Sequence, residues 1–126
     1  MALFTKDIWK ALRPSFKPGR TAILVVPTRS YMVELLAHAL DDKEMTGMRH
    51  INMFHVMVRF LNFDVTVMVR NHHHIQLVER IHEYTMGKHD IDLVLVDCGN
   101  IGEVEKRSLQ QIMSARMGTF SVMVDA

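Results

Sequence analysis

Asp97 is the residue whose type and position first suggest chemistry, because it directly follows the short apolar run of residues 93–96. The run is too short for a buried helix and is followed by Gly99, which predicts a central strand buried on both faces. Open α/β sheets bind ligands at the carboxyl ends of their strands. A carboxylate there caps the following loop or faces a ligand. We therefore expect a ligand crevice. Its candidate residues are Thr28, Asp97, Asn100 and Asp125.

Cys98 and histidines 72–74 are the other candidates for chemistry. A thiol nucleophile needs a positioned base or positive neighbours, and the sequence indicates no specific base for Cys98. Three consecutive side chains cannot all face one ion, and no Cys or carboxylate stands at the spacing of a zinc site. We expect neither a catalytic residue nor a bound metal or other cofactor, and interpret the histidines as a solvated loop and helix start.

The segments that would position these residues alternate between strands and helices. The predicted strands are 21–26, 63–69, 93–96 and 119–124, and the predicted helices are 32–40, 75–86 and 104–113. Such alternation implies right-handed crossovers and a mostly parallel sheet covered on both faces. We expect a three-layer α/β/α sandwich around a flavodoxin- or Rossmann-like sheet of about four to five strands.

Residues 43–62 fit two structures. Phe54, Met57, Val58 and Leu61 follow helical spacing, whereas Val56, Val58 and Phe60 alternate as in a strand. We favour a helix over 48–62, preceded by a loop at Gly47.

The first twenty residues are predicted to form a basic amphipathic helix and a linker, before a single α/β domain over 21–126. They carry five Lys and Arg side chains against Asp7 alone, a local excess of four positive charges. Such a helix usually buries its apolar side on the domain. The sharper alternative is contact with a membrane surface, nucleic acid or a partner groove. The candidate partner or nucleic-acid surface consists of Lys6, Lys10, Arg13 and Arg29.

Composition narrows the class of protein. The chain has 126 residues, 48% of them hydrophobic, and a net charge of +1, which suits one domain rather than a general polyanion binder. Its single cysteine cannot form an internal disulfide. No stretch approaches the ~20 apolar residues of a membrane span. We expect a cytoplasmic protein.

Three apolar strings resemble the receiver domain of two-component response regulators: AILVV at 22–26, DLVLVD at 92–97 and FSVMVDA at 120–126. In that family the aspartate that ends the third strand accepts a phosphoryl group, and Asp97 holds that place. The acidic residues that hold Mg²⁺ in the family are replaced by Pro27 and Thr28. Asp125 stands where the family has Thr or Ser, and the later strand with its lysine has no counterpart. The resemblance implies a degenerate receiver-like module.

A second resemblance involves LVVPTR at 24–29, which is similar to the segment of superfamily 2 helicases that touches the nucleic-acid backbone. In this comparison residues 93–97 match the strand that ends in a Mg²⁺-binding acid. Those enzymes need a glycine-rich phosphate loop with lysine, and none occurs here. This resemblance implies a nucleic-acid-binding remnant without ATP hydrolysis.

These observations lead to a non-catalytic regulatory or protein-interaction module of pseudo-receiver character. A protein partner or a second copy would dock on the N-terminal helix or on the sheet edge left by the absent final strand, because an unpaired edge invites another chain. The alternative is the nucleic-acid-binding remnant of a helicase-like P-loop core. An enzyme that uses Asp97 is the third hypothesis.

Overall fold

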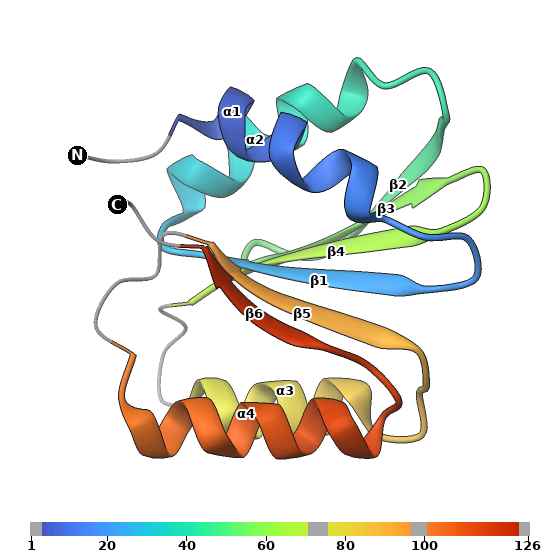
Figure 1. Ribbon diagram of the computed structural model, residues 1–126. Coiled ribbons are helices and arrows are strands. Elements are labelled where there is room, and N and C mark those ends of the chain that lie inside the picture. The colour runs from blue at the N-terminus through green and yellow to red at the C-terminus, as the bar shows by residue number, and fades with distance from the viewer. Residues whose placement is uncertain (1–3, 71–75, 97–100, 124–126) are drawn as a thin grey trace.

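One mixed sheet, with two helices on each face, organises the part of the chain that the computed structural model describes, residues 4–70, 76–96 and 101–123 (Figure 1). The strands are β1 (Thr21–Val26), β2 (Met45–Asn52), β3 (His55–Phe60), β4 (Asp64–Val69), β5 (Ile91–Val96) and β6 (Phe120–Met123). The helices are α1 (Thr5–Leu12), α2 (Arg29–Leu40), α3 (Leu77–Thr85) and α4 (Glu103–Ala115), with a short 3-10 turn η1 (Arg13–Ser15) after α1. The predicted three-layer α/β/α fold is confirmed.

The strand order is β2-β3-β4-β1-β5-β6. β4, β1, β5 and β6 are mutually parallel, and β3 is antiparallel to both β2 and β4, so it alone of these strands is reversed. Numbered along the chain, the four parallel strands have the order 2-1-3-4, as in flavodoxin-like doubly wound sheets. The described sheet therefore has six strands instead of the expected four to five.

The helix predicted over 48–62 is wrong, because this segment forms the antiparallel hairpin of β2 and β3. Along β3, Val56, Val58 and Phe60 are buried, and the residues between them face the other side of the sheet. Their alternation was the true signal, since successive strand residues point to opposite faces. Asn52 closes the turn by accepting a hydrogen bond from the Phe54 N–H at 2.8 Å.

Helices α1 and α2 cover one face of the sheet, called here the α1/α2 face. Ile8, Trp9 and Leu12 of α1 are buried there, and the Trp9 ring stacks on Phe60 with ring centroids 6.0 Å apart. α1 is thus the docked helix that its apolar spacing predicts, and its burial joins it to the core of the domain. This packing leaves the basic side chains of α1 on the outside.

Helices α3 and α4 cover the opposite, α3/α4 face. Ile81 of α3, and Leu109 and Met113 of α4, are fully buried against β1 and β5 residues such as Ile23 and Leu95. The helix predicted over 75–86 is α3, and it stops before Gly87, whose φ of 76° is a conformation that favours glycine. Residues 22–26 of β1 and 93–96 of β5 are buried on both faces, as these apolar runs predict.

Candidate interaction site

Thr28 is the one residue of the predicted ligand crevice that lies in the described ranges. It is the N-cap of α2, and its Oγ1 accepts a hydrogen bond from the Tyr31 N–H at 3.1 Å. Threonine is among the residue types that most often cap helices in this way. Asp97, Asn100 and Asp125 lie outside the described residues, as do Cys98 and histidines 72–74. The crevice therefore stays a prediction.

The predicted basic surface divides into two parts. Lys6 and Lys10 are exposed on α1, and Arg29 is exposed in the first turn of α2. Arg13, in contrast, is half-buried and forms ion pairs with Asp42 and Glu44.

Arg13 links η1 to the end of α2 and to the aromatic core. Its Nε lies 2.7 Å from Asp42 Oδ2, and its guanidinium carbon lies 4.8 Å from the centre of the Phe63 ring. The hydrogen bond with Arg13 lowers the pKa of Asp42, and the same bond raises the pKa of Arg13. The structure thus gives Arg13 a structural role, and its partner contact stays a prediction.

The two edges of the described sheet differ in how well they resist pairing. At one edge β2 carries the exposed Arg49, and its pairing with β3 is irregular at Gly47 and again near Asn52. Charges and bulges of this kind are what natural sheets use to block edge-to-edge association. At the other edge β6 pairs in regular parallel register with β5, and its four residues, FSVM, include no charge and no proline.

Alternate residues of β6 direct their backbone N–H and C=O groups away from β5. The Leu93 N–H donates to the Thr119 carbonyl at 2.8 Å, and Leu93 is in register with Phe120. In a parallel ladder a residue bonds to the two residues flanking its partner, so Thr119 and Ser121 face β5. The N–H and C=O groups of Phe120 and Val122 consequently point away from β5, toward the open edge.

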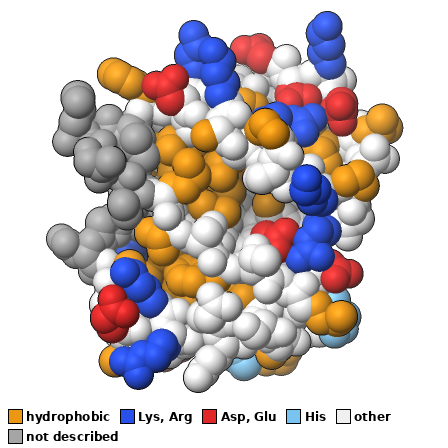
Figure 2. Space-filling model, in the orientation of Figure 1, with side chains coloured by type: hydrophobic (Ala, Val, Ile, Leu, Met, Phe, Trp, Pro, Cys, Tyr) orange, Lys and Arg blue, Asp and Glu red, His pale blue; other side chains and the backbone are white. Residues whose placement is uncertain are grey.

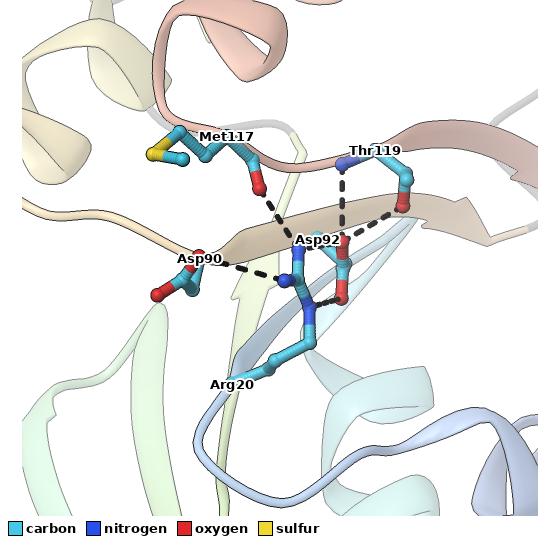
Figure 3. A network of polar contacts seen from close by, with 5 residues as sticks. All are labelled: Arg20, Asp90, Asp92, Met117 and Thr119. Carbon is cyan, nitrogen blue, oxygen red and sulfur yellow. Dashed lines mark hydrogen bonds and ion pairs between the residues drawn. The ribbon is translucent and has the colours of Figure 1, made fainter.

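A half-buried polar network fixes the start of β6 (Figure 3). Arg20 and Asp92 form two parallel hydrogen bonds, Nε to Oδ2 at 2.8 Å and NH2 to Oδ1 at 2.9 Å. Asp92 Oδ1 also accepts from the Thr119 N–H at 3.0 Å and from its hydroxyl at 2.8 Å. Arg20 NH2 donates to the Met117 carbonyl at 3.1 Å. These contacts tie the residue before β1, strand β5 and the α4–β6 turn together.

The electrostatics of this network favour its charged form. The Arg20 hydrogen bond, followed by those from Thr119, lowers the pKa of the Asp92 carboxyl, and the Asp92 hydrogen bond raises the pKa of Arg20. Because the network lies at the amino ends of the parallel strands, opposite the predicted crevice, it serves to position β6. This network could not be predicted from the sequence, because no local pattern indicates that Arg20 and Asp92, 72 positions apart, form a pair.

Gly118 makes the tight entry into β6. A Cβ at this position would overlap the Ile91 carbonyl oxygen. Met117 before it has a φ of 58°, and the Gly118 N–H closes the end of α4 by donating to the Met113 carbonyl at 2.9 Å. The turn therefore sets β6 close against β5.

The side of the molecule that presents β6 is apolar at its centre. Figure 2 shows hydrophobic side chains gathered in the region where β6 and β5 cross the view in Figure 1, with Lys, Arg, Asp and Glu mostly around the rim. Phe120, Val122 and Met123 of β6 are each partly buried. An apolar centre with a polar rim is the usual anatomy of a protein interface.

No family model and no curated protein matches the chain. One solved structure is similar. It is the large terminase of a thermophilic bacteriophage, with a TM-score of 0.54 and 7% identity over 96% of this chain. The matched part is 29% of the terminase chain, so this chain spans less than a third of that protein's length. At this identity the likeness concerns the fold alone.

Other site classes find no support in the described ranges. No three His, Cys, Asp or Glu residues of residues 4–70, 76–96 and 101–123 are placed to hold a metal ion together. None of the helices in these ranges has the length and apolar character that a bilayer span requires.

Proposed function

We propose that this protein is a non-catalytic interaction module that pairs through the free edge of β6 with β6 of a second copy. The observation that carries the proposal is the contrast between the sheet's two edges. β2 is charged and irregular, whereas β6 is regular and uncharged. A sheet that protects one edge and leaves the other apolar is suited to strand pairing there.

A second copy of the chain is a suitable partner for the β6 edge. A two-fold interface brings the same surface of both chains together, and the strands then run antiparallel across the axis. β6 brings no charge to such an axis, so no like charges oppose each other there. The apolar region beside β6 (Figure 2) adds side-chain burial to the few backbone hydrogen bonds that four residues can form.

A receiver-like, regulatory character remains part of the proposal. It is supported by the 2-1-3-4 order of the four parallel strands and by the likeness of the apolar strings described above.

The test is the mass in solution, measured by size-exclusion chromatography with light scattering over a hundredfold range of concentration. We expect a dimer that dissociates on dilution. Ser121→Lys places two like charges near the axis and should weaken dimerisation roughly tenfold or more. Because the Ser121 side chain is exposed, the fold should survive. Met48→Lys, at an exposed position of β2, is the matched control and should leave the dimer unchanged.

A wild-type mass of one chain at every concentration would contradict the proposal. Equal weakening by Ser121→Lys and Met48→Lys would contradict the assignment to β6. Thermal unfolding of both variants separates loss of pairing from loss of fold.

Nucleic-acid binding is a second candidate function. It is supported by the exposed positions of Lys6, Lys10 and Arg29 on the two helices of the α1/α2 face. It is limited by Arg13 and Arg20, whose guanidinium groups are already paired with carboxylates. Binding that falls steeply with salt is its signature.

A further inference from the structure

A groove of about 330 Å³ lies between the β2–β3 turn and α3, away from β6. Phe54, Met68 and Tyr84 give it an apolar wall, while Asn52, His55, Arg80 and Glu83 supply polar groups. A concave apolar site with a few polar groups is the usual form of a small-molecule site.

Arg80, like Arg116, forms no ion pair with a carboxylate among the described residues, unlike the other half-buried arginines. Arg13, Arg20 and Arg70 each pair with a carboxylate within 3.2 Å. Arg80 NH1 donates to the Arg70 carbonyl at 3.1 Å, and no carboxylate in the described part of the chain forms an ion pair with it. Burial lowers the pKa of Arg80. A partly desolvated guanidinium without a counter-charge favours binding of an anion.

The groups around Arg80 determine how much negative charge the groove accepts. The His55 ring meets the Tyr84 ring edge-on, with centroids 4.6 Å apart, and Lys88 Nζ lies 3.6 Å from the centre of the Tyr84 ring. Burial, and then the charges of Arg80 and Lys88, lower the pKa of His55 to about 4, so its ring is neutral at pH 7. Glu83 brings one negative charge to the same groove. This balance favours a ligand with a single negative charge.

We propose that this groove binds a small monocarboxylate with an aromatic or branched apolar body. The carboxylate pairs with the Arg80 guanidinium, whose fork of N–H donors matches two carboxylate oxygens. The apolar body lies against Phe54, Met68 and Tyr84. The volume exceeds what a bare inorganic anion would fill and suits one ring with a short side chain.

The experiment is an NMR titration of the full chain with four probes: phenylacetate, benzoate, the uncharged benzyl alcohol, and inorganic phosphate. We expect the two carboxylates to shift the signals of Arg80, Tyr84 and His55, and benzyl alcohol and phosphate to leave them in place. A bound negative charge also favours the protonated imidazole. The pKa of His55 should therefore rise on binding, and affinity should increase as the pH is lowered from 7 to about 5.5.

Arg80→Gln removes the charge while leaving a polar side chain, and should weaken carboxylate binding roughly tenfold or more. Arg116→Gln is the matched control, because Arg116 also donates to a backbone carbonyl, that of Thr85 at 3.0 Å, beside a different groove. It should change affinity less than twofold. If Arg80→Gln does not fold, Arg80→Lys, which keeps the charge and loses the fork, replaces it with the same expected direction.

Absence of carboxylate-induced shifts at millimolar concentration would overturn the proposal. So would equal binding of benzyl alcohol, or equal effects of Arg80→Gln and Arg116→Gln. Shifts with phosphate alone would overturn the ligand class. None of these outcomes depends on β6 pairing, so they are independent of the dimer test.

Discussion

Arg20 and Asp92, 72 positions apart in the sequence, form a two-bond ion pair that joins the entry of β1 to β5. The same carboxylate receives the Thr119 N–H and hydroxyl, so one side chain aligns three segments of the sheet. β6 is short, and it is positioned against β5 both by this network at its amino end and by packing in the same apolar cluster as α4. The free edge proposed for pairing is therefore held in place from its amino end.

Asp92→Asn should lower the free energy of unfolding by about 1–2 kcal/mol, because it weakens a partly exposed bidentate pair and its neighbouring hydrogen bonds. The folded-state pKa of Asp92 is lowered, so its contribution is complete above the unfolded-state value of 3.8 and disappears as the pH falls through the folded-state value. Urea unfolding at pH 7 and at pH 3 measures this. Asp41→Asn, at an exposed position, is the control. Equal losses for the two variants would contradict the role given to Asp92.

Gly118→Ala should be among the most destabilising single substitutions in the chain, by about 3 kcal/mol or more. The added methyl group meets the backbone carbonyl of Ile91, which cannot move without shifting β5. Gly102→Ala is matched in chemistry and should cost only a few tenths of a kcal/mol, because nothing lies within 4 Å of its added Cβ. Thermal unfolding of both variants decides the point. Similar melting temperatures would show that the α4–β6 turn tolerates a side chain.

Much of the sheet could be predicted from the sequence, because local pattern and burial agree there. Residues 22–26 of β1 and 93–96 of β5 are continuous apolar runs, and strands buried on both faces need such runs. The hairpin of β2 and β3 could not be predicted reliably. Phe54 and Leu61 completed a helical spacing that competed with the true alternation of Val56, Val58 and Phe60.

The site was less predictable than the fold, because it depends on distant pairs. From the sequence alone, Arg13 was predicted to be part of a basic surface. Its contacts with Asp42 and Phe63 form only in the folded chain, because these residues are distant in the sequence. The groove at Arg80 likewise exists because the β2–β3 turn folds back beside α3. The capping role of Thr28 was predictable, because a capping hydroxyl bonds to a backbone N–H only three residues further along the chain.

The nucleic-acid alternative predicts a salt dependence whose size follows from the number of contacting cations. With Lys6, Lys10 and Arg29 as the contacting cations, the slope of log affinity against log salt should be about −2.7, a loss of roughly 40-fold between 50 and 200 mM salt. Fluorescence anisotropy with a mixed-sequence duplex measures it. Replacing all three residues by Gln should abolish binding, while Arg107→Gln, an exposed change on α4, should not. Binding that is insensitive to the triple change would exclude this surface.

His55 should make the protein sensitive to acid. The pKa of His55 is about 4 in the folded chain, whereas the ordinary value is 6.5. Between these two pH values the unfolded chain therefore binds the proton more readily than the folded chain does. The free energy of unfolding should therefore fall as the pH drops below about 6.5 and level off below about 4, with a loss of roughly 1–2 kcal/mol at pH 5. The physical cause is burial of the ring, with Arg80 and Lys88 adding repulsion.

His55→Gln should remove this part of the pH dependence, whereas His82→Gln, at an exposed position of α3, should retain it. Urea unfolding at pH 7, 6 and 5 gives the three curves. The comparison uses slopes, because His55→Gln also changes the ring contact with Tyr84 and lowers stability at every pH. A wild-type slope in His55→Gln would locate the acid sensitivity in another histidine. A flat profile in both wild type and His82→Gln would show that the imidazole is hydrated, and that its contact with Tyr84 opens at little cost.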